Sequence, residues 1–415
     1  KKHRIVKERE QEENRMLQGK TVLLGVTGGI AAYKMPNVAR MLKKMHCNVH
    51  VLMTQNATNF ITATTFETLT GNKCLIDTFD RNFEFSVEHV ALAKQADLVL
   101  IAPATANVIG KIANGIADDM LTTTVMACTC KMLVAPAMNH NMYHNSIVQE
   151  NLEKLKRHGY EIIDPVCGML ANGDTGDGKL PSEETLVEYV LRELAFEKDM
   201  QGLKVLVTAG PTQEAIDPVR FISNHSTGKM GYAIAKNAML RGAEVTLVTG
   251  KTALEPPMFV QTVPVISAKD MYQAVMERAK EQDIIVKAAA VADYTPAHTA
   301  DEKIKKSEGE LSLALEKTTD ILAELGKNKG KTVLCGFSME TEHMLENSRA
   351  KREKKNLDMI AANNLKQQGA GFAGDTNVLT LITEKWEKEL ALMSKDEAAK
   401  CLLDELLKLK IVNSK

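Results

Sequence analysis

The sequence predicts an α/β protein of two domains, each built on a mainly parallel sheet flanked by helices. Short, continuously apolar runs alternate with helical stretches, a pattern typical of parallel strands that are buried on both faces. The pattern begins at "KTVLLGVTGG" (20–29) and restarts at "LKVLVTAGPT" (203–212). A length of 415 residues also suits two domains of roughly 200 residues each.

The first domain is predicted over 16–195. Its first apolar run ends in a glycine turn, and a helical pattern follows from Ile30 to His46. Further strands are expected within 48–54, 96–104 and 131–138. Residues 1–15 mix charges without the apolar centre of a signal peptide, so we expect a disordered leader.

The second domain is predicted over 203–415, after a helix that runs into a charged linker at 196–202. Apolar strands are expected near 243–249, 283–294 and 331–337, with a helix near 228–241. The C-terminal segment indicates a strand pair and a closing helix. Glycine-rich turns follow strands in both domains, where parallel sheets bind their ligands.

Composition excludes several classes of function. A net charge of −1 and an aromatic content of 4% argue against nucleic-acid partners. No apolar run reaches the length of a membrane span, so no membrane partner is expected. The seven cysteines are scattered, which suits reduced thiols in a cytoplasmic protein, and Cys128 and Cys130 are interpreted as small core residues.

The first domain offers polar groups after its strands. "GVTGGIAAYK" lacks the G-x-G-x-x-G spacing, but a glycine turn that opens a helix suits a phosphate. A tight turn without a ligand is about equally compatible with this stretch. Thr105 and Asn107 directly follow a strand, where they could border a planar cofactor or simply begin a helix.

The histidines of the first domain allow more than one interpretation. His140 and His144 have the i, i+4 spacing of a metal pair, but the Glu of H-E-x-x-H is absent, which favours surface or capping roles. His89 lies on a predicted apolar helix, where a lone histidine is more often structural. Asn139 follows the strand at 131–138.

The run "PVCGMLANGDTGDGKLP" (165–181) is rich in glycine and is predicted to be irregular, because glycine weakens strand and helix interiors. A calcium-loop interpretation fails, since the third ligand position falls on Gly176 rather than on Asp177. Either a mobile lid or a phosphate cradle remains compatible with the run.

The second domain contains three candidate segments. A glycine- and hydroxyl-rich loop over 208–235 presents Arg220 and Lys229 to an anion. "KAAAVADYTP" (287–296) combines small residues, which let a flat base approach the backbone, with Asp293. Lys351 and Lys355 lie four apart on one helical face, where an intervening triphosphate would relieve their repulsion.

Several motifs together resemble a known family. "GVTGGIAAYK", "SVEHVALAK", "APATANVIGKIANG" and "APAMNHNMY" occur in the order found in homo-oligomeric, flavin-containing cysteine decarboxylases. The second half resembles the usual bacterial fusion partner of these enzymes. Residues 16–415 are therefore similar to the bifunctional phosphopantothenoylcysteine decarboxylase/phosphopantothenate–cysteine ligase family of coenzyme A synthesis. The resemblance implies two Rossmann-like or flavodoxin-like domains.

For the first domain, the resemblance implies FMN as cofactor. His89 would be the base that assists oxidation of the substrate thiol, and Asn139 would bind the substrate carboxylate. Asn172 stands where the family commonly has a lid cysteine that donates the final proton, and an amide cannot replace a thiol in that role. The residues implied around FMN are Gly28, Gly29, Ile30, Thr54, Phe60, Thr105 and Asn107.

For the second domain, the resemblance implies activation of 4′-phosphopantothenate by CTP with Mg²⁺, through an acyl-cytidylate, and attack by cysteine. Asn224 would contact the acyl group, and Lys303 would serve the nucleotide and amide-forming steps. The residues implied for substrate binding are Arg220, Lys287, Ala288, Ala289, Asp293, Asp320, Ile321, Phe337, Lys351 and Lys355. The Mg²⁺ ligands are not identified.

The sequence departs from the family pattern at Thr318-Thr319, where Asn-Pro is common, and at Ser338-Met339, where Ala-Ala is common. The resemblance also implies trimers of the first domain joined by dimers of the second, which gives a dodecamer. An alternative to the complete bifunctional enzyme is an active ligase whose flavin-binding domain is impaired in the final reduction by Asn172.

Overall fold

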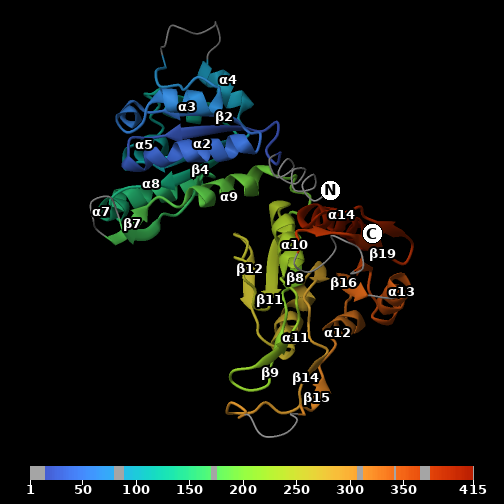
Figure 1. Ribbon diagram of the computed structural model, residues 1–415. Helices are drawn as coiled ribbons and strands as arrows, with labels where there is room; N and C mark the ends of the chain where they lie inside the picture. Colours follow the sequence, from blue (N-terminus) through green and yellow to red (C-terminus); the bar gives the residue numbers. More distant parts are fainter. Residues whose placement is uncertain are drawn as a thin grey trace. The chain divides into compact units, whose positions relative to one another are not determined.

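The computed structural model describes residues 15–78, 88–169, 175–305, 312–340, 343–364 and 374–414. The chain divides into two compact units between Phe196 and Glu197 (Figure 1). Among the described residues, no helix is long and apolar enough to cross a membrane.

The first unit is built on five parallel strands in the order β2-β1-β3-β4-β5. The strands are β1 (Thr21–Val26), β2 (Asn48–Met53), β3 (Leu98–Ala104), β4 (Lys131–Pro136) and β5 (Glu161–Ile162). Every residue of β1 and β3 is buried, as continuous apolar strands in the interior of a parallel sheet require. In the sheet, β2 lies on one side of β1, and β3, β4 and β5 follow on the other side. The order in which successive strands are added therefore reverses between β1 and β3, and sheets of this class bind their ligands at such a reversal point.

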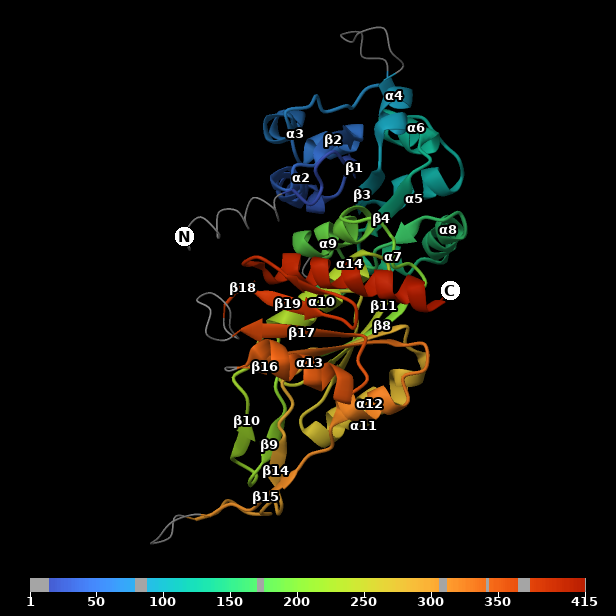
Figure 2. The same cartoon turned by 90° about the vertical axis from the view of Figure 1, so that its right-hand side faces the viewer.

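Helices cover both faces of this sheet, α2, α3 and α9 on one face and α4, α5, α6 and α8 on the other (Figure 2). Their bounds are α2 (Met35–Lys44), α3 (Ala63–Thr70), α4 (Glu88–Gln95), α5 (Ala106–Ala113), α6 (Met120–Ala127), α8 (Ser146–Arg157) and α9 (Glu183–Leu194). Short helices η1 (Ile30–Lys34), η2 (Gln55–Asn59) and α7 (His140–Tyr143) follow strands β1, β2 and β4. The helix predicted over 30–46 is thus divided into η1 and α2.

Within the glycine-rich run at 165–181, β6 (Val166–Met169) and β7 (Thr175–Lys179) pair as an antiparallel hairpin, so the prediction of irregular structure was wrong for these two segments. Its glycines serve close packing. A Cβ atom on Gly178 would collide with the carbonyl oxygen of Met138, and Gly178 also has a φ of +125°. The low strand propensity of glycine is therefore overridden by the need to bring β7 against the segment after β4.

The second unit contains an eight-stranded sheet in the order β12-β11-β8-β13-β16-β17-β19-β20, of which the first six strands are parallel. The strands are β8 (Lys204–Ala209), β11 (Glu244–Thr249), β12 (Gln261–Pro264), β13 (Ile284–Lys287), β16 (Val333–Glu340), β17 (Met359–Asn364), β19 (Leu379–Ile382) and β20 (Glu387–Glu389). In chain order the parallel strands read 3-2-1-4-5-6, and the reversal lies between β8 and β13. The predicted fold class is confirmed in both units.

Five longer helices flank this sheet, namely α10 (Lys229–Leu240), α11 (Ala268–Arg278), α12 (Ile321–Lys327), α13 (Met344–Lys354) and α14 (Lys395–Ser414). A short helix η3 (Ala279–Glu281) extends α11, and β18 (Thr376–Asn377) pairs with β21 (Met393–Ser394). The hairpins β9 (Gln213–Ala215)–β10 (Phe221–Ser223) and β14 (Tyr294–Pro296)–β15 (Leu315–Lys317) project side by side beyond the sheet (Figure 2). The predicted loop over 208–235 therefore contains a hairpin, while the predicted C-terminal strand pair and closing helix are present as β19–β20 and α14.

Candidate functional site

The first unit contains a cavity of about 740 Å³ at the carboxyl ends of β1, β3 and β4. Four segments form its walls: the turn after β1, the start of α5, the segment joining β4 to α7, and the hairpin β6–β7. The cavity therefore lies at the reversal point of the sheet, where flat cofactors bind in this class of fold.

Thr27 joins the two strands that border the reversal. Its Oγ1 donates to the carbonyl oxygen of Pro103 at 2.6 Å and accepts from the backbone N–H of Thr105 at 3.0 Å. Gly28 follows, and a Cβ atom there would lie 2.5 Å from the Cβ of Asn56. Glycine at this position therefore lets η2 approach the turn that forms the floor of the cavity.

The residues present fit a flavin mononucleotide. Thr54 Oγ1, at the end of β2, is buried and has no hydrogen-bond partner among the described residues. A buried hydroxyl without a partner is costly, so it marks a place where a polar ligand would complete the bonding. The start of η1 and the N-terminus of α5 supply backbone N–H groups suited to phosphate and hydroxyl oxygens, whereas the N–H of Gly29 already donates to the carbonyl oxygen of Thr27 at 2.9 Å.

The structure brings together only part of the predicted flavin site. Five predicted residues line the cavity: Gly28, Gly29, Ile30, Thr105 and Asn139. Thr54 is buried and is not among the lining residues. Phe60 and Asn107 are exposed and lie outside the lining, as does His89 near the start of α4. Asn172 lies outside the described residues.

Asn139 is the N-cap of α7, where its side-chain oxygen accepts from the N–H of Asn141 at 2.9 Å. That bond fixes the amide, whose nitrogen remains a donor for a ligand carboxylate. Sequence reasoning missed the neighbouring apolar wall of Met138, Met142 and Met169, because these residues meet only when β6–β7 folds against α7.

The second unit has a cavity of about 410 Å³ at the reversal between β8 and β13. Most predicted substrate residues line it together, including Asn224, Lys287, Ala288, Ala289, Asp293, Asp320, Ile321, Phe337, Lys351 and Lys355. The start of α10, with Ser226, Thr227 and Gly228, forms a further wall.

Positive charge is concentrated on one side of this cavity. Lys355 Nζ lies 2.6 Å from Asp320 Oδ2, and Lys351 Nζ donates to the carbonyl oxygen of Phe337 at 3.4 Å. Burial, reinforced by these two lysines against the attraction of Asp320, lowers the pKa of Lys287 to about 8. Burial raises the pKa of Asp320, but the bonds from Lys355 and from the N–H of Ala323, together with the charges of Lys355 and Lys287, outweigh it, and the net pKa is below the ordinary value. The cluster carries more cations than anions and therefore suits a polyanion.

The backbone after β13 is held rigidly on both sides. Thr208 Oγ1 accepts from the N–H of Ala289 at 3.1 Å, and Thr318 Oγ1 donates to the carbonyl oxygen of Ala292 at 2.6 Å. Asn224 Nδ2 donates to the carbonyl oxygen of Ala290 at 2.9 Å. A fixed backbone edge with small side chains can present its N–H and C=O groups to a flat heterocycle.

Two predicted residues are not part of this cavity. Arg220 Nε donates to Asp217 at 2.9 Å, and its Nη2 donates to the carbonyl oxygen of Ile304 at 3.1 Å. The Arg220 bond, opposed by burial, holds the pKa of Asp217 well below its usual range. Lys303, next to Ile304, is exposed. Arg220 therefore fastens the segment that carries Lys303, away from the cavity lining.

Sequence reasoning missed Lys395 and Asn363, which also line the cavity. Lys395 is the first residue of α14, and burial, with the nearby charge of Lys229, lowers its pKa to about 8. Asn363 Oδ1, in β17, is buried and has no hydrogen-bond partner among the described residues. Neither position carries a local motif, since both reach the cavity through long-range packing.

These two sheets and cavities define a two-domain α/β protein with a flavin-type site and a polyanion site. Residues 10–195 match the Flavoprotein family model, and residues 200–409 match the model described as the DNA/pantothenate metabolism flavoprotein C-terminal domain. The chain is 45% identical over 395 residues to the coenzyme A biosynthesis bifunctional protein CoaBC of Bacillus subtilis (strain 168), covering 94% of this chain and 97% of the relative. It is 43% identical over 392 residues to the CoaBC protein of Haemophilus influenzae, covering 94% and 98% of the two chains.

Among solved structures, the C-terminal domain of a CoaBC protein is 42% identical, with a TM-score of 0.45, over 51% of this chain and 98% of that domain. The chain belongs to the CoaBC family of bifunctional coenzyme A biosynthesis proteins. The family predicted from the sequence is confirmed.

Proposed function

We propose that the chain joins cysteine to 4′-phosphopantothenate at the expense of CTP and then decarboxylates the product to 4′-phosphopantetheine with FMN. Membership of the bifunctional family supports the pairing of two activities in one chain. The observation that carries the ligase assignment is the lysine-lined cavity at the β8/β13 reversal. The proposal divides into one reaction for each cavity.

In the second unit, Lys287, Lys351 and Lys355 would bind the triphosphate of CTP. Their positive charge would stabilise pyrophosphate as it leaves, when the substrate carboxylate attacks the α-phosphorus. The fixed backbone of Ala288 and Ala289, with Asp293, would bind the cytidine. Mg²⁺ would accompany the triphosphate as a further source of positive charge; its protein ligands are left open.

Asn224 would then orient the acyl-cytidylate while the cysteine amine attacks its carbonyl carbon and CMP leaves. Lys303 and Arg220 do not line the cavity of their own chain. We therefore assign Lys303 to the cavity of a second copy in a dimer of second units, with Arg220 anchoring the segment that carries it. This assignment accounts for the exposure of Lys303.

In the first unit, FMN would lie along Gly28, Gly29 and Ile30, with Thr54 and Thr105 bonding its polar groups. Bound FMN supplies the two-electron oxidation of the substrate thiol and the later reduction. Asn139 would hold the substrate carboxylate by its amide N–H, and loss of CO₂ would follow oxidation at the neighbouring carbon–sulfur group. His89 lies outside the cavity of its own chain. The His89 of a neighbouring copy in a trimer would therefore accept the proton that the substrate loses in the oxidation.

A second candidate follows from Asn172. With an amide at the lid position, the ligase would be complete, and oxidation and decarboxylation would proceed, but the enethiol would be reduced poorly. The observation that favours this candidate is the presence of asparagine, rather than cysteine, at position 172.

The ligase proposal is tested by mixing the full chain with CTP, cysteine and 4′-phosphopantothenate and measuring pyrophosphate. We expect repeated turnover that depends on all three substrates. Without cysteine, release should stop after the first turnover, because the acyl-cytidylate is not consumed. Pyrophosphate release that is unchanged when cysteine and 4′-phosphopantothenate are omitted, or no release at all, would refute it. Flavin binding is tested separately, from the visible absorbance of the purified protein.

A further inference from the structure

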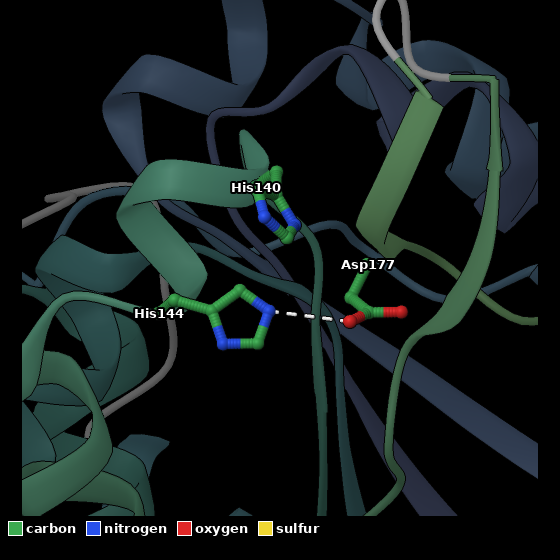
Figure 3. Close-up of side chains that lie close together, drawn as sticks. All are labelled: His140, His144 and Asp177. Carbon is green, nitrogen blue, oxygen red and sulfur yellow. Dashed lines mark hydrogen bonds and ion pairs between the residues drawn. The ribbon is translucent and has the colours of Figure 1, made fainter.

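Two histidines and a carboxylate meet beside the first-unit cavity (Figure 3). His140 begins α7, His144 directly follows it, and Asp177 comes from β7. One ligand atom from each residue lies within 4.8 Å of the other two, and His144 Nε2 lies 3.2 Å from Asp177 Oδ2. The sequence pattern alone favoured surface or capping roles for the histidines, because the Glu of H-E-x-x-H is absent. The third residue, Asp177, lies 33 positions beyond His144 and is brought to it by the fold.

The spacing is close to that of a metal centre. Zinc binds histidine nitrogen and carboxylate oxygen at about 2.0–2.2 Å in tetrahedral geometry, which places neighbouring ligand atoms about 3.3 Å apart. The separation of His144 and Asp177 already matches this value. The third ligand atom lies within 4.8 Å of the other two, and side-chain rotation would have to close the remaining distance.

His140 is held in place by the hairpin. Its Nδ1 is buried and has no hydrogen-bond partner among the described residues. A Cβ atom on Gly176 would lie 2.8 Å from that nitrogen, so the ring packs directly against the backbone of β7. The rings of His140 and His144 are in edge contact, 4.4 Å apart from centroid to centroid.

The ligand types indicate the ion. Imidazole nitrogens are preferred by zinc and by neighbouring divalent transition metals, whereas Mg²⁺ and Ca²⁺ prefer sites composed of oxygen. Three protein ligands leave a fourth position for water, as in open zinc sites.

We propose that His140, His144 and Asp177 bind one divalent transition-metal ion of the zinc type. The ion would fasten β7 to α7. Asn139 precedes α7's first residue and Gly178 follows Asp177, and both line the cavity. The metal would therefore fix two walls of the cavity relative to each other. This site is additional to the two reactions proposed above, and its test does not depend on them.

The test is Zn²⁺ binding to the full chain, freed of metal by chelation and followed by titration calorimetry, with Co²⁺ absorption as a report on geometry. We expect one high-affinity ion per chain and Co²⁺ bands of a four-coordinate site. His144→Gln and Asp177→Asn should each weaken binding by at least about 100-fold, more than loss of an outer partner costs.

Two variants serve as matched controls. His158→Gln removes an exposed histidine outside the cluster, and Cys167→Ser removes the exposed thiol of β6, a competing zinc ligand. Both should retain the ion. Equal binding by wild type and the two cluster variants, or loss of binding with Cys167→Ser alone, would overturn the proposal.

Hydrogen exchange gives a second readout. Zn²⁺ should slow exchange of the backbone amides of β7, residues 175–179, in the wild type but not in Asp177→Asn. If the ion binds without slowing exchange in β7, the fastening of the hairpin is refuted.

Discussion

At the scale of single residues, Lys287 should make the proposed binding of CTP dependent on pH. Its pKa of about 8 means that it is mostly charged at pH 7 and mostly neutral at pH 9. The affinity for CTP should therefore fall as the pH rises from 7 to 9, because one cation of the cluster is lost. Titration calorimetry at several pH values measures this.

Lys395, whose pKa is also lowered to about 8, would contribute to the same fall. The variant Lys287→Met separates the two, since its CTP affinity should be weak at pH 7 and change less between pH 7 and 9. A steep fall of equal size in the wild type and the variant would contradict the role given to Lys287.

Lys355 gives a prediction at constant pH. Lys355→Ala should lower CTP-dependent pyrophosphate release by about 10- to 100-fold, the usual cost of losing a charged hydrogen bond. Lys354→Ala, which removes the exposed neighbour on α13, is the matched control and should leave the rate unchanged. Similar losses in both variants would show that Lys355 has no specific role.

The role of the amide at Asn172 is tested by the variant Asn172→Cys, which introduces a thiol at this position. If the amide at this position impairs the final reduction, mass spectrometry of wild-type products should show material two hydrogens short of 4′-phosphopantetheine, and Asn172→Cys should remove it. A normal yield of 4′-phosphopantetheine from the wild type would refute the impairment.

At the scale of elements, the hairpin β6–β7 depends on glycine. Gly178→Ala should destabilise the first unit by more than about 2 kcal/mol, because it adds a collision with Met138 to the strain of a positive φ. Gly71→Ala is the control: Gly71 has a φ of +75° but no atom within 4 Å of an added Cβ, so only strain is added. Chemical unfolding measures both, and equal losses would contradict the packing role of Gly178.

Local sequence patterns predicted most elements of the two sheets, because buried parallel strands are continuously apolar and their helices are amphipathic. They failed for β6 and β7, because the β7 glycines Gly176 and Gly178 are required by close contacts with α7 and with the segment before it. Residues at the end of a strand or directly after it, such as Lys287 and Thr105, were found as site candidates because the carboxyl ends of parallel strands share one edge. Lys395 and Asp177 were not found as members of these sites, because each reaches its site from a distant part of the chain.

At the scale of the whole molecule, the position of His89 predicts a shared active site. His89 does not line the cavity that contains Asn139 in its own chain. If the site forms between copies, His89→Asn and Asn139→Ala should each be inactive in decarboxylation, while a mixed oligomer should regain activity. Random assembly of equal amounts restores both residues at about one quarter of the sites.

Co-expression of the two variants with different tags, followed by purification through both tags, provides the mixed oligomer. Activity no higher than that of either variant would contradict a site shared between copies. Light scattering of the wild type gives the size of the assembly, for which we propose a dodecamer; a monomer would contradict both proposals.

The most direct test of the bifunctional assignment uses cysteine labelled with ¹³C in its carboxyl group. The purified chain, with its flavin, is mixed with 4′-phosphopantothenate, CTP and labelled cysteine, and both pyrophosphate and ¹³CO₂ are measured. We predict ¹³CO₂ release that requires CTP and follows pyrophosphate release, because the ligase product is the substrate of the decarboxylase. Pyrophosphate without ¹³CO₂, or ¹³CO₂ without CTP, would contradict the account.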